Sequence, residues 1–550
     1  MLEEVLRFSR LDVWVVIIYA FVIMANGIYQ SMKVKSQNDY LLGGKAFGVF
    51  STLCTQGASM KGASSLIGYP AGVFTSGIGV LIPSQCYNMG AWIAIAAGIP
   101  RRVRACAAKL DLRSGGDLFR HRFNSQGVKA LAGAWGAWQT FVLVTNTMAA
   151  VALILSLAFG KYGITYEKAL IISIVFSVIY TTAGGLLSVV ANDVLQWCIM
   201  TPVIFVLLPA FCIFGHGITP EAVHSSLSTA FFSLKPNVWW TGFFISGIMA
   251  ANTDICILTR YISAKDQETS VKGAMFGFAY TTLFAGATVF IGLAAAMVVD
   301  KAVLGGNDEQ AIFALISRVL PHGLIGLFIA AALATMISTL DSYLQTTSLV
   351  LMVDVIQPSL SKDLTDKQAL MLSRILTLLI ACAAALIVLK LRSILQITYL
   401  GKNVYVSAIF VPMMACMFWS RLTLKGTVAG IVCGSVMGVL ATVIYKLPLP
   451  GVWGVAVSLI ATVAVSLMTS NEAKPLLPGF IERGLKIDVI IARASVIGCI
   501  GTVVLTVGLA LYVNWFLVIL GAAMFLLCIK MIYGAFDKKH GPELASDKPV

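Results

Sequence analysis

Five ionisable side chains interrupt long apolar stretches of this 550-residue sequence, and they are Lys61, Asp193, Asp254, Asp341 and Lys402. A charged group inside a lipid bilayer is costly, so such residues commonly serve an ion or solute pathway. The competing interpretation is a side chain that snorkels from a helix end or neutralises another charge. This second interpretation is stronger for Lys402 and Asp193, which lie nearer the ends of their apolar stretches.

Oxygen-bearing side chains cluster around one of these carboxylates. Ser338, Thr339, Asp341 and Ser342 fall within about one and a half helical turns. Hydroxyl, carboxylate and carbonyl oxygens at helical spacing suit a small hard cation, because each oxygen replaces part of its hydration shell. Serine and threonine also bond to their own helix backbone, so the cluster alone is more often structural.

Two apolar stretches are broken by small and polar residues. Residues 57–70 read GASMKGASSLIGYP, and residues 246–254 read SGIMAANTD. Paired interruptions in corresponding halves of a membrane protein indicate discontinuous helices around a solute site near the bilayer midplane. The alternative is that small residues merely allow close helix packing. The two stretches are five spans apart, so they enter the membrane from opposite faces, as inverted repeats require.

The elements that must position these residues are membrane helices. The chain is 58% hydrophobic and only 12% charged, whereas ordinary globular chains are about a quarter charged. These values exclude a soluble enzyme, a disordered protein and a disulfide scaffold. Apolar runs of about 20 residues, the length that crosses a bilayer, recur about fifteen times, and we expect 13 to 15 spans. They begin at Leu11, Phe47, Val73, Gly127, Thr165, Leu187, Trp239, Gly273, Leu324, Arg374, Leu395, Gly426, Gly451, Ser495 and Val513.

The net charge of +14 is explained by orientation in a membrane better than by a nucleic-acid partner, which we do not expect. Basic residues concentrate in alternate loops, roughly 25 on one side against roughly 10 on the other. The richer side is predicted to be cytoplasmic, which places the N-terminus outside and the C-terminus inside. Its basic residues include Lys33, Lys35, Lys45, Arg101, Arg102, Arg104, Lys109, Arg113, Arg120, Arg122, Arg260, Lys265, Lys272, Lys538 and Lys539.

Four ordered motifs carry a resemblance to a known family. They are DYLLGGK at residues 39–45, LRSGGDLF at 112–119 with Arg122 and Phe123, YTTAGGL at 180–186 followed by NDVLQ at 192–196, and ATMIST at 334–339. Together they resemble the sodium/solute symporter family, which contains sodium/proline, sodium/pantothenate, sodium/sialic acid and sodium/glucose cotransporters. The likeness runs from about residue 39 to about residue 425.

The resemblance implies an all-α polytopic membrane protein with a LeuT-type fold of two inverted five-helix repeats. We expect an extra helix and a cytoplasmic loop over residues 1–46, the transport core over 47–419, accessory helices over 420–533 and a short cytoplasmic tail over 534–550. The protein is predicted to be a multi-pass component of the cell membrane, surrounded by the lipid bilayer.

The same resemblance implies where ions and solute bind. The conserved sodium ion would be held by Ala58, Lys61 and Thr335 through carbonyls, and by the hydroxyls of Ser338 and Thr339. Some family members hold a second sodium ion, whose matching positions are Asp193, Ser338, Asp341 and Ser342. The solute would lie between the two breaks, near Gln56, Ser59, Ser64, Asn252, Thr253 and Asp254.

Lys61 departs from the family pattern, which has an apolar residue at its position. Its ammonium would act as a tethered cation in place of sodium, partnered by Asp193 or Asp341, and transport would then be sodium-independent or proton-coupled. Alternatively, it binds a solute carboxylate while its carbonyl serves the ion. Family precedent places sodium-coupled symport of a small polar organic solute first. Lys61 and Asp254 together would fit a zwitterion such as an amino acid.

Two other function classes are less consistent with the sequence. A membrane-embedded enzyme would need a catalytic base, but the histidines lie outside the spans, at His121, His216, His224, His322 and His540. A transporter-like sensor would need an output domain, and the tail after Tyr533 is short. We therefore expect no enzymatic activity and no cofactor other than Na+ as the coupling ion.

Overall fold

The computed structural model describes residues 7–34, 36–43, 47–227, 229–232, 238–360, 364–390, 394–481, 486–511 and 515–536. These residues form helices and loops, and no β-strand occurs among them. Several residues discussed above lie outside the described ranges, namely Lys35, Lys45, Lys538, Lys539, His540 and Val513, where the last predicted span begins. The predicted tail over 534–550 is described only as far as residue 536.

The first half of the described chain contains α2 (Arg10–Ser31), α3 (Gln37–Leu42), α4 (Val49–Ser59), α5 (Tyr69–Ser76), α6 (Leu81–Ser84), α7 (Cys86–Ala96), α8 (Ile99–Leu110), α9 (Gly116–Phe123), α10 (Gln126–Phe159), α11 (Tyr166–Pro202), α12 (Leu208–Ala210) and α13 (Pro220–Ser226). The second half contains α14 (Val238–Thr253), α15 (Ile255–Ser263), α16 (Gln267–Val298), α17 (Ala311–Val319), α18 (Leu324–Val350), α19 (Gln357–Ser359), α20 (Asp366–Val388), α21 (Ile394–Phe418), α22 (Leu424–Val439), α23 (Pro450–Met468), α24 (Pro478–Ile481), α25 (Lys486–Leu511) and α26 (Trp515–Ala535).

Short π and 3-10 segments extend or join these helices. The π segments are η2 (Ser64–Gly68), η5 (Val203–Leu207), η6 (Phe211–Gly215), η10 (Leu351–Ile356) and η11 (Leu440–Ile444). The 3-10 segments are η3 (Gly77–Val80), η4 (Gly160–Tyr162), η7 (Thr229–Phe232), η8 (Lys301–Leu304), η9 (Asp308–Gln310) and η12 (Ser470–Glu472).

Thirteen helices in the described part of the chain are long and apolar enough to cross a membrane, within the predicted range of 13 to 15. The predicted span from Phe47 is observed as α4, a break, and then η2 and α5. The predicted span from Thr165 is the first part of α11, which bends at Gly185. The left-handed conformation of Gly185, with φ of 55°, favours glycine at this bend.

Both predicted discontinuous helices are present. The helix of α4 ends at Ser59, and Met60 to Ala63 separate it from η2. The second break falls at Asp254, which lies between α14 and α15 and has a non-helical ψ of 119°. At the first break, a Cβ on Gly62 would lie 2.8 Å from Thr339 Cγ2, so glycine allows α18 to approach the break closely.

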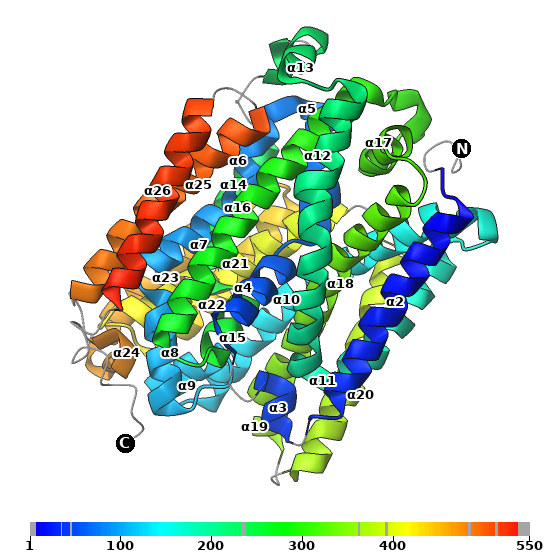
Figure 1. Ribbon diagram of the computed structural model, residues 1–550. Helices are drawn as coiled ribbons and strands as arrows, with labels where there is room; N and C mark the ends of the chain where they lie inside the picture. The colour runs from blue at the N-terminus through cyan, green and yellow to red at the C-terminus, as the bar shows by residue number, and fades with distance from the viewer. Residues whose placement is uncertain are drawn as a thin grey trace.

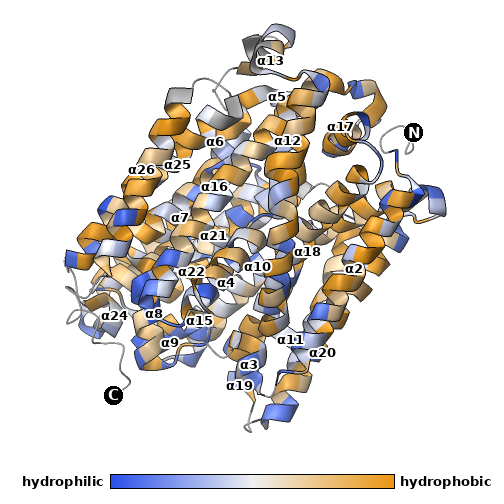
Figure 2. Cartoon of the chain, viewed as in Figure 1, coloured by the Kyte–Doolittle hydropathy of each residue, from blue (hydrophilic) through white to orange (hydrophobic). Residues whose placement is uncertain are grey.

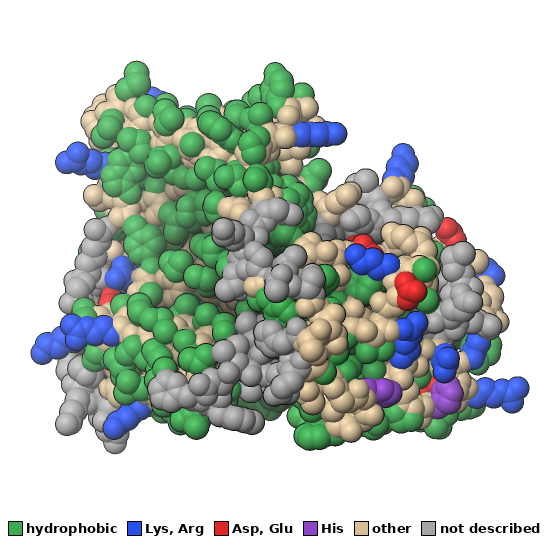
Figure 3. Space-filling view, turned by 90° about the horizontal axis from the view of Figure 1, so that it is seen from above, with side chains coloured by type: hydrophobic (Ala, Val, Ile, Leu, Met, Phe, Trp, Pro, Cys, Tyr) green, Lys and Arg blue, Asp and Glu red, His purple; other side chains and the backbone are tan. Residues whose placement is uncertain are grey.

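The core helices surround α18, which packs against α4, α10 and α11. In Figure 1, α25 and α26 lie on the left of the bundle and α2 and α20 on the right. The helices are predominantly hydrophobic, and hydrophilic residues gather around α8, α9 and α15 at the lower end (Figure 2). Seen from above, hydrophobic side chains cover much of the surface, and Lys and Arg project at its margin (Figure 3).

The start of α2 and the end of α26 lie at opposite ends of the bundle (Figure 1), as an odd number of crossings requires. Which end faces the cytoplasm stays a prediction. Some residues counted as basic loop positions are not solvated. Arg101 and Arg102 are buried and both contact Asp488 at the start of α25, at 2.8 and 2.9 Å. Arg260 is also buried, on α15, the helix that begins directly after the break at Asp254.

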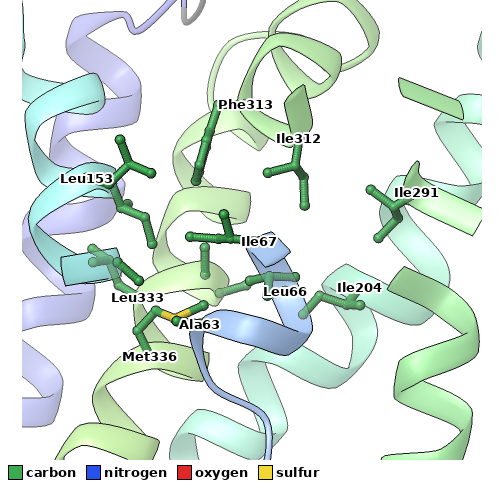
Figure 4. Packing of buried hydrophobic residues seen from close by; sticks show 14 of the residues in the cluster. Ala63, Leu66, Ile67, Leu153, Ile204, Ile291, Ile312, Phe313, Leu333 and Met336 are labelled. Atoms are coloured by element: carbon green, nitrogen blue, oxygen red, sulfur yellow. The ribbon is translucent and has the colours of Figure 1, made fainter. Parts of the chain in front are cut away.

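An apolar layer closes the region above the first break. Ala63, Leu66 and Ile67 lie beneath Ile312 and Phe313 of α17 (Figure 4). The labelled side chains around them come from α10, η5, α16 and α18, and are Leu153, Ile204, Ile291, Leu333 and Met336. All ten residues belong to one buried hydrophobic cluster. The bundle is therefore sealed by packed side chains between the break and the end that carries α17.

Candidate transport site

The residues predicted to hold a cation meet where the first break contacts α18. The Ser338 hydroxyl donates to the carbonyls of Ala58, at 3.3 Å, and Thr335, at 3.1 Å. The Thr339 hydroxyl donates to the same two carbonyls, at 3.5 and 3.1 Å. The Lys61 amide also donates to the Ala58 carbonyl, at 3.2 Å. Two carbonyls and two hydroxyls thus converge in the interior, and neutral hard oxygens of this kind suit a monovalent cation.

The residues that the family resemblance assigned to a second cation lie in two separate groups. The Asp193 carboxylate on α11 accepts from Thr55, at 2.5 Å, and from Ser59, at 3.2 Å. Ser59 also bonds to Ser342, at 2.6 Å. Asp341 lies apart from this group and accepts from Thr181 on α11, at 3.0 Å. The structure therefore brings Asp193 and Ser342 together through Ser59, and Asp341 faces another part of the core.

A buried arginine completes the group around Asp193. Arg260 on α15 is only 2% exposed and donates from Nη2 to the Ser342 hydroxyl, at 2.8 Å. Its charge also interacts with that of Asp193. The remaining guanidinium atoms Nε and Nη1 have no hydrogen-bond partner among the described atoms, and neither does Asp193 Oδ1. Arg260 thus supplies a fixed positive charge beside the residues matched to the second cation.

A small cavity of about 60 Å³ adjoins the first break. Two residues predicted to contact the solute, Ser59 and Ser64, line it. Lys61 and Thr339, which were assigned to the cation, line it as well. The remaining walls come from α7, α10, α18 and α21 and include Tyr87, Gln139, Asn146, Tyr343, Thr398 and Lys402.

The ammonium of Lys61 lies against α7. Its Nζ lies 3.5 Å from Asn88 Oδ1 and 5.9 Å from the ring centre of Phe284. The side chain is 3% exposed. Neither Asp193 nor Asp341 forms an ion pair with it, which differs from the predicted partnership, because the first break directs the side chain to the cavity and away from α11.

Four of the predicted solute contacts lie outside the cavity. Gln56 is fully buried beside Tyr261. Asn252 donates to the Ile248 carbonyl of its own helix, at 2.8 Å, and Thr253 bonds to its own helix backbone.

Asp254 serves as the N-cap of α15. One of its oxygens accepts from the amides of Cys256, at 2.8 Å, and Ile257, at 3.1 Å. The other accepts from the Tyr87 hydroxyl and from Gln139 Nε2, the latter at 2.7 Å. A carboxylate engaged by four donors and fully buried has a structural role at the second break.

A family model, described as the sodium:solute symporter family, matches residues 40–434 of this chain. The chain belongs to this family. It is therefore a transporter and not an enzyme, and with its 13 candidate spans it is a multi-pass protein of the cell membrane. This finding confirms the resemblance drawn from the four sequence motifs.

Curated relatives align with most of the length of this chain. The osmoregulated proline transporter OpuE of Bacillus subtilis (strain 168) is 26% identical over 83% of this chain and 94% of the relative. A sodium/proline symporter of Staphylococcus aureus is 24% identical over 85% of this chain and 94% of the relative.

The fold is also that of solved transporters. A Na+-coupled sialic acid symporter superposes with a TM-score of 0.71 at 19% identity, covering 85% of this chain and all of the other. The nucleobase-cation-symport-1 transporter Mhp1 superposes with a TM-score of 0.51 at 15% identity, covering 82% and 98%. These neighbours confirm the predicted LeuT-type fold.

Several site residues of this symporter-family chain were not among the sequence predictions. Tyr87, Gln139, Asn146 and Thr398 line the cavity from helices far apart in sequence. A polar residue in an apolar span is a weak signal on its own, because it is satisfied as easily by its own helix. Lys402 was singled out in the sequence as an intramembrane cation. It was not predicted to line a solute cavity, because it lies near the end of a predicted span and was interpreted there as a snorkelling side chain.

Proposed function

We propose that the protein is a sodium-coupled symporter of a small polar organic solute and works by alternating access. The observation that carries the proposal is the meeting of the Ala58 and Thr335 carbonyls with the Ser338 and Thr339 hydroxyls. These oxygens belong to a broken helix and to the helix that packs on it. Such a pair can change its separation when the core rocks, so cation binding is linked to conformation.

The cavity and the cation oxygens share Thr339, so solute and ion would lie close together. A cation that orders the first break would also order the cavity wall, and each ligand would favour binding of the other. The apolar layer under α17 closes one route to this site. Parting of this layer would open the site at that end of the bundle.

Arg260 supports coupling to a single cation. Its guanidinium bonds to Ser342 and interacts with Asp193, where the family resemblance would place a second cation. A second cation at this position would meet a fixed like charge in a medium of low dielectric constant, which repels it strongly.

The alternative is coupling without sodium, in which Lys61 acts as the bound cation. The position of its ammonium beside Asn88 gives this alternative less support, because the oxygens assigned to sodium do not bond to that ammonium. Direct binding measurements distinguish the two mechanisms.

The test is the apparent melting temperature of the purified protein in detergent, titrated with NaCl against choline chloride. A ligand that binds only the folded state raises this temperature as its concentration exceeds its dissociation constant. For Ser338→Ala we expect the half-saturating NaCl concentration to rise by roughly tenfold, because one of four converging oxygens is lost. Sodium-driven uptake into proteoliposomes should weaken in parallel.

Ser458→Ala is the matched control, because Ser458 is also a buried serine that donates to a helix carbonyl, that of Gly430, at 3.0 Å in the accessory region. It should leave the sodium response unchanged. A wild type that ignores sodium would contradict the proposal. If Lys61→Ala then acquires a sodium response, the lysine is the bound cation.

A further inference from the structure

Two lysine side chains line the same small cavity. Lys61 approaches it from the first break and Lys402 from α21, and they are 3% and 8% exposed. Their charges act on each other. Two like charges in a buried cavity repel each other and lose hydration, so the arrangement is costly without an anion.

The described residues do not provide that anion. Lys61 Nζ contacts the neutral Asn88, and Lys402 Nζ lies 4.3 Å from the ring centre of Phe243 and 5.4 Å from that of Tyr87. Neither ammonium forms an ion pair with a described carboxylate. Asp254 is the one carboxylate that influences Lys402 electrostatically, but its two oxygens already accept from Tyr87, Gln139 and two backbone amides.

Three further polar groups on the cavity wall can donate to the oxygens of a small acid. Asn146 Nδ2 reaches Ser64, at 3.2 Å, and Thr398, and the Ser64 and Thr398 hydroxyls lie 3.0 Å apart. These hydroxyls can donate to a bound oxygen once they turn toward it. The cavity is small, at about 60 Å³, which favours a solute of few non-hydrogen atoms.

We propose that the transported solute is a small organic anion whose carboxylate binds between Lys61 and Lys402. The proposal rests on the proposed function, since it names the solute class of the same site. One carboxylate would neutralise much of the repulsion between the ammonium groups and accept charge-assisted hydrogen bonds from them. The carboxylate's small organic remainder would lie against Leu143 and Tyr343, which also line the cavity.

An amino acid such as proline, the substrate in the relatives' names, is the competing solute. Its ammonium would need a charged acceptor, whereas the unpartnered acceptors on the cavity wall are the neutral amide oxygens Gln139 Oε1 and Asn146 Oδ1. The acid expected to supply one, Asp254, does not line the cavity and is saturated by four donors. A zwitterion would therefore bring a third positive charge beside two that are already unpaired.

The experiment measures protection of the purified full-length transporter against thermal unfolding at a fixed NaCl concentration. The probes are acetate, propionate and L-lactate, compared with L-proline and D-glucose. We expect the three carboxylates to raise the apparent melting temperature saturably and the other two not to do so. Uptake of radiolabelled L-lactate into proteoliposomes should fall by at least roughly tenfold in Lys402→Met and in Lys61→Met, because a charge-assisted hydrogen bond is lost.

Lys425→Met is the matched control, because Lys425 is exposed and pairs with Glu472 outside the cavity. It should transport L-lactate like the wild type. Protection of the wild type by proline or glucose but by none of the carboxylates would overturn the proposal. This comparison requires no variant, so it holds even if a lysine substitution prevents folding. Carboxylate protection that persists in both methionine variants would overturn it as well.

Titration with NaCl against choline chloride, without any organic probe, separates this proposal from the proposed function. A sodium response without carboxylate binding would overturn the proposal that the solute is an organic anion and would leave sodium coupling in place. Protection by carboxylates without a sodium response would support the proposal that the solute is an organic anion and would contradict sodium coupling.

Discussion

Arg260→Met is expected to lower the free energy of unfolding by about 2–3 kcal/mol, because the buried Asp193 carboxylate loses the positive charge that acts on it without a direct ion pair. The Ser342 hydroxyl also loses its donor. The loss should appear as a lower apparent melting temperature in detergent and as a smaller yield of folded protein. Arg260→Lys should lose less, since it keeps the charge but not the planar group of donors.

The double variant Arg260→Met with Asp193→Asn is the decisive control. Removing both charges should recover much of the lost stability, because the asparagine still accepts hydrogen bonds from Thr55 and Ser59 without carrying an uncompensated charge. Arg260→Met alone should also gain an additional stabilisation by NaCl, since Asp193 and Ser342 become available to a second cation. A double variant no more stable than the single one would contradict the interaction between these two charges.

The elements of the site could be predicted because they depend on local sequence. Long apolar runs specify membrane helices whatever surrounds them. The small and polar residues around Lys61 and Asp254 predicted the positions of both helix breaks to within a few residues. The cation oxygens followed from helical spacing, since Thr335, Ser338 and Thr339 lie on one face of α18.

The partners of these elements could not be predicted, because they depend on helix packing. Arg260 lies three residues before the end of α15 and was counted with loop cations. Its contact with Ser342 joins residues 82 positions apart. Likewise, nothing local to Lys402 indicates that α21 brings it to the cavity beside Lys61, 341 positions earlier in the sequence.

Asp254 illustrates how one residue type supports two interpretations. A carboxylate at a break in a membrane helix is expected both for a solute ligand and for an N-cap. The sequence alone does not separate them, because the deciding contacts come from Tyr87 on α7 and Gln139 on α10. The structure favours the cap, and a pair of substitutions distinguishes the two roles.

Asp254→Ala is expected to lower the free energy of unfolding by about 3 kcal/mol. The N-cap of α15 is lost, and the buried donors of Tyr87 and Gln139 no longer have their acceptor. Asp254→Asn should lose only about 1 kcal/mol, because asparagine caps a helix as well as aspartate does. Thermal unfolding of both variants in detergent, beside the wild type, measures the difference.

Transport by Asp254→Asn then separates the cap from a solute ligand. If Asp254 only caps α15, the KM for the transported solute should stay close to the wild-type value and the preference between L-lactate and L-proline should not change. If Asp254 binds a solute ammonium, the same variant should raise the KM for L-proline by roughly tenfold or more with little loss of stability, since a charged hydrogen bond to the solute is lost. A raised KM with unchanged stability would therefore return Asp254 to the solute site and restore the zwitterion as the substrate class.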